Sequence, residues 1–200
     1  MEETRERILQ AAHAAFANHG FRGATTRRIA TEAGVNEVTL FRLFACKDDL
    51  LREAIERQSQ RSTEALRVHR LPETPCDLRR ELTTHLMGTL RGFLQARQAV
   101  RTSMAEWEQH PSLQEPLLRT THSVYDELRA YLKAAQVNGL IRSDVGVAVM
   151  TQTVLATVFA DALLRDMMPD RFPLEPGASV DAYIEIALDG LAVPKKGPAE

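Results

Sequence analysis

The chain has 200 residues, of which 44% are hydrophobic and 26% are charged, and its formal net charge is −2. This length and composition suffice for one or two small globular domains with a real core. The near-neutral charge gives no overall basic signature, so any contact with nucleic acid has to be local. Only two cysteines occur, Cys46 and Cys76, and neither has a partner at metal-ligand spacing. A disulfide framework is therefore not expected, and a reducing cytoplasm is the easier interpretation.

The first predicted helix covers about residues 4–18. Ile8, Ala12 and Phe16 form one apolar stripe at helical spacing, and Gly20 ends the helix. Its expected role is to brace the next two helices from behind.

The stretch 25–47 predicts two short helices around a tight turn. Thr26 is placed as the N-cap of the first, and Gly34 as its left-handed C-terminal residue. Asn36 is placed to cap the second helix, with Val35 and Leu40 spaced as a hydrophobic staple. Two short helices joined by a glycine-containing turn form a helix-turn-helix, whose second helix can enter a DNA major groove.

Charge is unevenly distributed around this motif. Five cations face two acids between Gly20 and Lys47, whereas residues 48–56 carry four acids and one cation. A local basic patch fits a compact DNA-contacting surface. A solvated helix face gives similar counts.

Six further helices are predicted from apolar residues at helical spacing between breakers, at about 47–69, 74–94, 100–107, 112–138, 143–168 and 179–191. Thr74, Ser143 or Asp144, and Ser179 are placed as N-caps for three of them. The apolar helix at 143–168 is interrupted by Gln152 and Asp161, so it is expected to be buried rather than to span a membrane. The predicted fold is all-α, with about nine helices and no convincing strand.

Residues 1–55 resemble the DNA-binding domain of the tetracycline-repressor-like (TetR) family. The matching pieces are ILxAAxxxF, GFxxxTTxxIAxxAGV, TLFRxF and KxxLL, in the family's order and spacing. The remainder is similar to the family in length and helical pattern. The resemblance implies a helix-turn-helix domain at 1–50, a helical ligand-binding and dimerisation domain at 51–193, and a flexible tail at 194–200. It also implies a homodimer formed by the last two helices.

By position within the shared motif, the resemblance implies nine DNA-binding residues, namely Thr26, Arg27, Arg28, Glu37, Val38, Thr39, Phe41, Arg42 and Lys47. Thr26 and Lys47 lie at helix starts, where free N–H groups also favour a phosphate. Arg27 is expected at the groove edge. Glu37 can accept a hydrogen bond from a cytosine amine, or it can simply stabilise the helix dipole. Phe41 replaces a common tyrosine of the family, so a phenol-to-phosphate hydrogen bond is lost.

The second domain carries no enzyme signature, and its histidines show no metal spacing, so neither a cofactor nor a metal is expected. The resemblance implies a small-molecule site instead, with candidate wall residues His85, Leu90, Phe93, Met104, Trp107, His122, Tyr125, Met150 and Phe159. Each of these is otherwise an ordinary core residue. The mixture of aromatic, sulfur and polar groups suits a largely apolar or aromatic effector.

Together these features predict a cytoplasmic, dimeric, ligand-responsive transcriptional regulator, by family precedent a repressor, that leaves a palindromic double-stranded operator when its effector binds. The alternative is a constitutive DNA-binding protein whose second domain is a protein-interaction module without a ligand. Titrating ligands against the DNA complex separates the two. Cys46, beside Lys47 at a helix start, is either a redox switch or a small residue tolerated at a weak cap.

Overall fold

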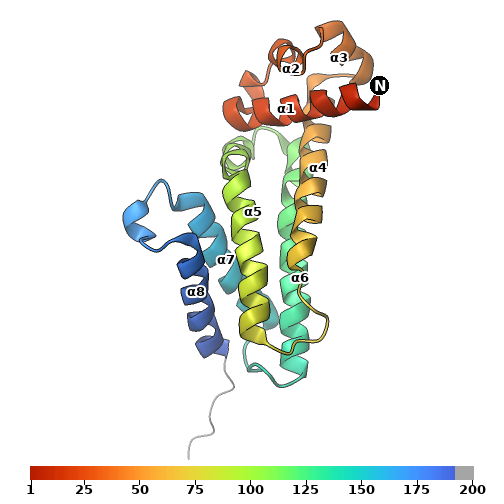
Figure 1. Cartoon of the computed structure of the whole chain (residues 1–200). Coiled ribbons are helices and arrows are strands. Elements are labelled where there is room, and N and C mark those ends of the chain that lie inside the picture. The colour runs from red at the N-terminus through yellow and green to blue at the C-terminus, as the bar shows by residue number, and fades with distance from the viewer. Residues whose placement is uncertain (192–200) are drawn as a thin grey trace, which may run out of the picture. The chain divides into compact units, whose positions relative to one another are not determined.

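The computed structural model describes residues 1–191, apart from the side chain of Leu117 (Figure 1). This part of the chain contains eight α-helices and three short 3₁₀ helices, and no strand. The predicted all-α class is therefore confirmed. The predicted tail at 194–200 lies outside the described residues.

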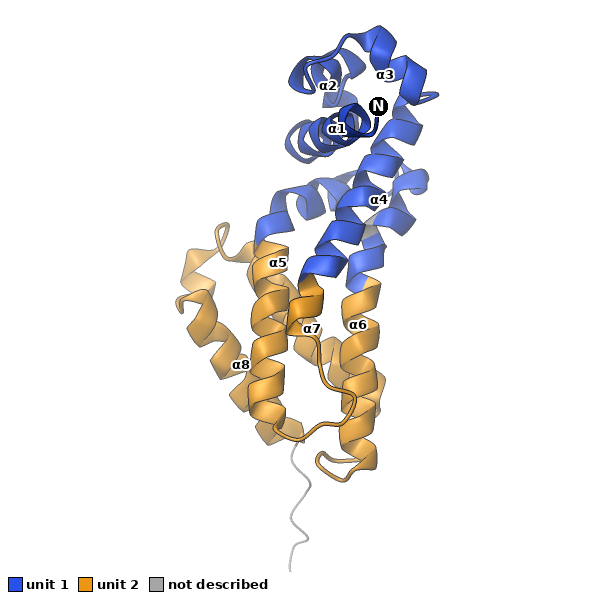
Figure 2. Ribbon diagram, turned by 45° about the vertical axis from the view of Figure 1, so that its right-hand side comes forward, with its two compact units in different colours: residues 1–65, 95–121 blue, residues 66–94, 122–200 orange. Residues whose placement is uncertain are grey.

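The chain forms two compact units, which are coloured separately in Figure 2. Unit 1 comprises residues 1–65 and 95–121, and unit 2 comprises residues 66–94 together with the described residues from 122 onward. Two long helices contribute to both units. The functional boundary predicted at residue 50 stays a prediction, since a compact unit and a functional domain need not coincide.

Unit 1 begins with four helices, α1 (Glu2–Gly23), α2 (Thr26–Glu32), α3 (Glu37–Leu43) and α4 (Lys47–Leu66). Its core is built from the stripe predicted on α1 and the inward residues of the next three helices, and Phe16, Ile29, Leu40 and Leu50 are fully buried there. α1 continues to Gly23 rather than ending at Gly20 as predicted, and Gly20 instead kinks it with a φ of 68°.

The remaining helices are η1 (Arg67–His69), α5 (Leu78–Glu106), η2 (Pro111–Leu113), α6 (Gln114–Val137), α7 (Val147–Leu164), η3 (Pro169–Arg171) and α8 (Pro176–Leu191). Within unit 2, apolar residues of α5, α6, α7 and α8 form one core that includes Leu86, Leu90, Leu128, Val158 and Ile184.

The helices predicted at 74–94 and 100–107 are one continuous helix, α5, so the count is eight where about nine were expected. Residues 95–99 contain only good helix formers, and nothing in them interrupts the backbone ladder. α5 also begins later than predicted, at Leu78, because Asp77 rather than Thr74 caps it by accepting a hydrogen bond from the Arg80 N–H at 3.1 Å.

Two later helix starts also differ from prediction. α7 follows Gly146 rather than Ser143 or Asp144. α8 begins three residues before Ser179, at Pro176, because proline has no N–H to leave unpaired in a first turn and its φ already suits a helix. Ser179 is instead buried inside the helix.

By length and composition alone, α7 is apolar enough to cross a membrane. Its Asp161 is fully buried, however, and forms an ion pair at 2.7 Å with Arg165, one turn later. The Tyr183 hydroxyl of α8 donates to the same carboxylate at 2.9 Å. A paired, hydrogen-bonded charge and the core residue Val158 mark α7 as a helix of the unit 2 core, as predicted.

Candidate nucleic-acid interface

The turn between α2 and α3 has a fixed backbone geometry. Gly34 adopts a φ of 66°, and the Val35 N–H donates to the Ala30 carbonyl at 2.9 Å. The Gly34 N–H donates to the Thr31 carbonyl at 3.1 Å, which completes a Schellman motif. The predicted glycine C-terminus is therefore confirmed, and α3 leaves this turn in a defined direction.

The N-caps of the two helices follow the sequence pattern with one correction. Asn36 caps α3 as predicted, because its Oδ1 accepts from the Thr39 N–H at 2.8 Å. In α2 the cap is Thr25 rather than Thr26, since the Thr25 hydroxyl accepts from the Arg28 N–H at 3.3 Å. Thr26 is the first residue of the helix, which frees its hydroxyl for another partner.

That partner is Glu37, the first residue of α3. The Thr26 hydroxyl donates to Glu37 Oε2 at 2.9 Å, so two residues that the sequence assigns to DNA contact bind each other. The Thr39 hydroxyl is likewise engaged, because it donates to Asn36 Oδ1 at 2.8 Å. Both hydroxyl groups keep lone pairs that can accept a hydrogen bond.

The outer face of α3 is open to solvent. Val38 is 70% exposed and Phe41 is 51% exposed, while Arg42 lies beside them and Leu40 is fully buried on the opposite side. A short helix with one buried anchor and an exposed apolar and cationic face can enter a major groove and contact the base edges there.

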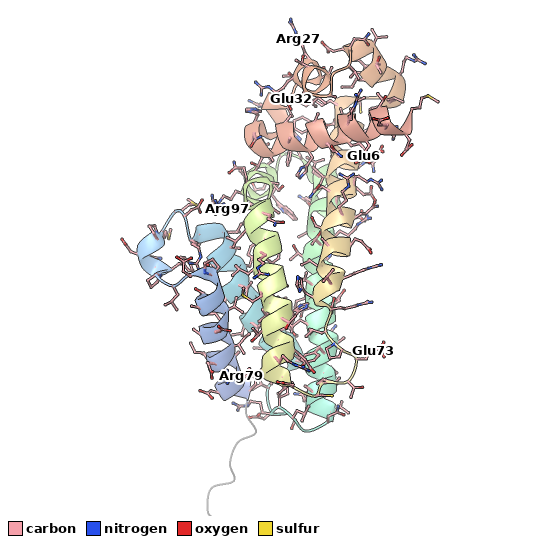
Figure 3. The ribbon with its side chains drawn as sticks, viewed as in Figure 1. Glu6, Arg27, Glu32, Glu73, Arg79 and Arg97 are labelled. Carbon is pink, nitrogen blue, oxygen red and sulfur yellow. The ribbon has the colours of Figure 1, made fainter. Side chains whose placement is uncertain are left out.

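The two arginines of α2 differ in their surroundings. Arg27 is exposed and extends away from the helix, as Figure 3 shows. Arg28 is exposed too, but its guanidinium donates to the Gly23 carbonyl at 2.9 Å, which gives a hydrogen-bond partner to the last carbonyl of α1. Arg27 is therefore the freer of the two for reaching a base or a phosphate.

Lys47 begins α4 and is only partly exposed. Its ammonium group donates to the Phe21 carbonyl and lies 4.4 Å from the centre of the Phe21 ring. Burial lowers the pKa of Lys47, against the opposing effect of the Asp48 and Glu106 carboxylates. An ammonium group has three N–H donors, so this lysine can hold Phe21 and still offer a donor to a phosphate.

Residues from outside the predicted helix-turn-helix complete this corner of unit 1. Glu106 Oε1 accepts from the Phe21 N–H at 3.1 Å, and the His110 ring stacks on Phe21 with centroids 3.6 Å apart. The Thr102 hydroxyl donates to the Ala17 carbonyl at 2.7 Å. The end of α1 is thus hydrogen-bonded to the end of α5. In the sequence, only Gly20, which marks a break in the helix just before Phe21, pointed to this region.

The candidate effector residues are not gathered at one place. Leu90, Phe93 and Met150 lie in the unit 2 core, where Phe93 meets Phe159 edge to face at 5.2 Å. Tyr125 is half-buried against the same core, and His85 is buried. His122 is exposed in unit 2, while Met104, 58% exposed, and Trp107 belong to unit 1.

The described residues hold no metal site, and Cys46 is a free thiol. Through residue 191, no three His, Cys, Asp or Glu side chains are placed to hold a metal ion. Cys46 is exposed, and its sulfur accepts from the Asp49 N–H at 3.5 Å, which makes it a weak cap for α4.

The capped helices α2 and α3, joined by a glycine turn with the face of α3 exposed, have the geometry of a helix-turn-helix, a DNA-binding class whose second helix enters the major groove. Residues 8–54 match the family described as bacterial regulatory proteins, tetR family. The transcriptional repressor AcnR of Corynebacterium glutamicum is 27% identical over 187 residues, which cover 92% of this chain and 88% of AcnR.

Solved structures share the fold. FadR of Bacillus subtilis, determined in complex with stearoyl-CoA, superposes with a TM-score of 0.72 at 16% identity, over 93% of this chain and 98% of that one. The TetR-family regulator PfmR of Thermus thermophilus superposes with a TM-score of 0.66 at 19% identity, over 94% and 100% of the two chains. Residues 8–54 thus match a TetR-type DNA-binding domain, and the relatives together with the shared fold support a TetR-family transcriptional regulator.

Proposed function

We propose that this regulator is a dimeric repressor that occupies a palindromic operator and leaves it when a small, largely apolar effector binds unit 2. The observation that carries the proposal is the exposed face of α3, held on a capped helix behind a Schellman turn. Repression rather than activation is supported by the relative AcnR, which is named a transcriptional repressor.

On the operator, two copies of α3 would enter successive major grooves about 34–36 Å apart. Val38, which is exposed, would touch a thymine methyl group, and the exposed Arg42 and Arg27 would reach bases or phosphates. Thr26, at the first turn of α2, and Lys47, at the first turn of α4, would bind phosphates together with nearby backbone N–H groups. Arg28, Glu37, Thr39 and Phe41 complete the proposed contact surface.

The proposed dimer surface consists of the outer faces of α7 and α8. Val149 is 62% exposed on α7, and Thr153 and Ala156 follow it on the same exposed side. Ile186 is 73% exposed on α8. Exposed apolar residues on neighbouring helices suit burial against a second copy as a four-helix bundle.

Effector control is supported by FadR, which was solved with an acyl-CoA bound. Release from DNA requires that the effector bind the DNA-incompetent state more tightly, typically by about 1–3 kcal/mol. The proposed location is the cytoplasm, where operator and effector meet.

Fluorescence anisotropy on the upstream intergenic DNA, across a salt series, tests the DNA-binding part of this proposal. Binding to that DNA should exceed binding to a scrambled sequence, and Arg27→Ala should weaken it and reduce the log–log salt slope by about 1. Arg129→Ala, an exposed arginine of unit 2, is the charge-matched control and should leave both unchanged.

The same assay tests effector control when small molecules are added to the complex. Release by at least one compound is expected. A complex that responds to none of them would favour a constitutive regulator whose second unit binds proteins. Equal, weak binding to both DNA sequences would contradict operator recognition.

A further inference from the structure

Unit 2 contains two deeply buried polar atoms that have no hydrogen-bond partner, namely His85 Nε2 and Thr89 Oγ1. His85 is 4% exposed and Thr89 is 1% exposed. Both belong to α5 and are four residues apart, so their side chains lie on the same face of the helix, one turn from each other. The hydroxyl of Thr89 does not even bond back to its own helix, unlike that of Thr84, which donates to the Arg80 carbonyl at 2.9 Å.

Buried polar groups without partners lose their hydrogen bonds to water and gain none in return, so natural proteins keep few of them. Among the described residues only one other such side-chain atom occurs, on Glu6, and that carboxylate is ion-paired with Arg57 and Arg61. The pair on α5 has no such explanation among the residues that the structure describes. It therefore indicates a partner that these residues do not supply.

The protonation state of His85 defines what this partner must offer. Its Nδ1 lies 3.0 Å from the His69 carbonyl oxygen and 3.8 Å from Glu127 Oε1, and both of these atoms only accept hydrogen bonds. Nδ1 therefore carries the proton. Burial lowers the pKa of His85, against the opposing effects of the His69 carbonyl and Glu127, so the ring is neutral at pH 7. Nε2 is then a bare acceptor that needs a donor.

The backbone next to the pair fixes this arrangement. Gly88 lies between His85 and Thr89 in sequence, and the His69 ring occupies the space that a side chain at Gly88 would fill. Glu127 Oε1 also accepts from the Leu71 N–H at 2.7 Å, which holds the segment after His69 in place. The His69 carbonyl is thus held against Nδ1, and the tautomer of His85 follows from packing.

Apolar residues of the same helix surround the pair. Leu82, Leu86, Leu90 and Phe93 are buried in the unit 2 core to which this face of α5 contributes. A ligand in such surroundings is expected to be apolar over most of its surface, with one group that can both donate and accept a hydrogen bond.

We propose that His85 Nε2 and the Thr89 hydroxyl form the polar subsite for the hydroxyl group of an otherwise apolar effector, a phenol or an aliphatic alcohol. The ligand hydroxyl donates to Nε2 and accepts from Thr89. A carboxylate does not fit, because it has no proton for Nε2 and would be buried close to Glu127. This inference rests on the proposed effector site in unit 2 and specifies the chemistry of its ligand.

Matched probes test the hydroxyl requirement on the full-length protein. Isothermal titration with 4-propylphenol, its methyl ether and 4-propylbenzoate, and with 1-octanol and its methyl ether, compares ligands that differ in one group. At least one of the two hydroxyl compounds should bind about tenfold tighter than its ether, the worth of one buried hydrogen bond. Equal affinities, preference for the benzoate, or no binding by either hydroxyl compound would overturn the proposal.

Two variants locate the subsite. His85→Asn keeps an amide donor near the position of Nδ1 and deletes the Nε2 acceptor, and Thr89→Val deletes only the hydroxyl. Each should reduce the affinity for the hydroxyl compound to that of its ether, whereas Thr84→Val, the matched control, should not. Thr89→Val should leave the ligand-free protein as stable as the wild type or more stable, because it removes an unpaired buried group. Unchanged affinity in both variants would refute the assignment.

Nitrogen-15 NMR of the histidine rings gives an independent readout. In the ligand-free protein, Nε2 of His85 should show the shift of an unprotonated nitrogen with no donor, and 4-propylphenol should move it toward the hydrogen-bonded value. If Nε2 is already hydrogen-bonded and no probe changes it, a trapped water explains both atoms and the subsite does not exist. Operator release by other compounds, with His85 unaffected, would retain effector control while rejecting this subsite.

Discussion

The hydroxyl of Thr26 donates to the carboxylate of Glu37 at 2.9 Å and so joins the first residue of α2 to the first residue of α3. The bond places a negative charge beside the helix start at which a DNA phosphate is expected. Glu37 therefore has a third role besides the two that the sequence suggested: it orients α3 against α2. On DNA, the carboxylate and a phosphate would compete for the same donors.

Glu37→Gln should raise the affinity for scrambled DNA several-fold, because it removes one negative charge from the phosphate side of the motif. The ratio of operator to scrambled affinity should fall, since the carboxylate no longer selects a cytosine amine. Anisotropy titrations on both DNAs measure this. Glu32→Gln, an exposed acid at the other end of α2, carries the same charge change and should not alter the ratio. An unchanged ratio in Glu37→Gln would show that the residue only positions α3.

Lys47→Met keeps an unbranched side chain beside Phe21 but removes the ammonium group. Loss of its bond to the Phe21 carbonyl should lower the free energy of unfolding by about 1 kcal/mol. Loss of the proposed phosphate contact should also reduce the salt slope of operator binding by about 1. Urea unfolding and the salt series measure the two effects separately. A destabilised variant with an unchanged slope would assign Lys47 to folding alone.

Gly20→Ala should be more harmful than Gly34→Ala, although both glycines have a φ near +67°. A Cβ at Gly34 meets nothing within 4 Å, so only backbone strain of about 1–2 kcal/mol is expected there. A Cβ at Gly20 would lie 2.6 Å from Glu106 Oε1 and would disturb the carboxylate that binds the Phe21 N–H. Chemical denaturation of both variants gives the comparison. Equal losses would mean that Glu106 moves aside without cost.

Stability should decrease as the pH falls from 7 toward 5, because burial lowers the pKa of His85 below its ordinary value of 6.5. Below pH 6.5, His85 binds a proton in the unfolded chain more readily than in the folded chain. The free energy of unfolding is therefore greatest above pH 6.5 and declines below it. His13, whose pKa burial also lowers, contributes in the same direction. His85→Asn should flatten the decline in part, and urea unfolding at several pH values measures it. An identical pH profile in the variant would contradict a neutral, buried His85.

Most of what the sequence predicted correctly about the DNA-binding motif came from residues that act on their near neighbours in the chain. Gly34 and Asn36 act within a few residues of themselves, so a left-handed turn and a side-chain cap are readable from sequence. The cap of α2 is Thr25 rather than the predicted Thr26, because Thr25 offers the same hydroxyl one position earlier. The bond between Thr26 and Glu37 depends on how two helices meet, and no spacing rule gives that.

Contacts between distant segments were beyond the same reasoning. Nothing near Phe21 indicates that Glu106 will accept from its N–H, because the two are 85 residues apart. The family resemblance implies that Met104 and Trp107 are effector residues, whereas both belong to unit 1. Periodicity identifies the apolar face of a helix and does not reveal which packed body the end of a long helix joins.

Because α5 and α6 serve both units, the DNA-binding unit is not a contiguous piece of the gene product. Its core includes Leu113, which is 1% exposed, and α1 is held by Thr102 and Glu106. A fragment that stops at residue 65 would lack all three and would expose the apolar surface that they cover. The recognition helices therefore cannot be transplanted by cutting the chain after α4; a portable version would have to carry residues 95–121 as a fused helical hairpin.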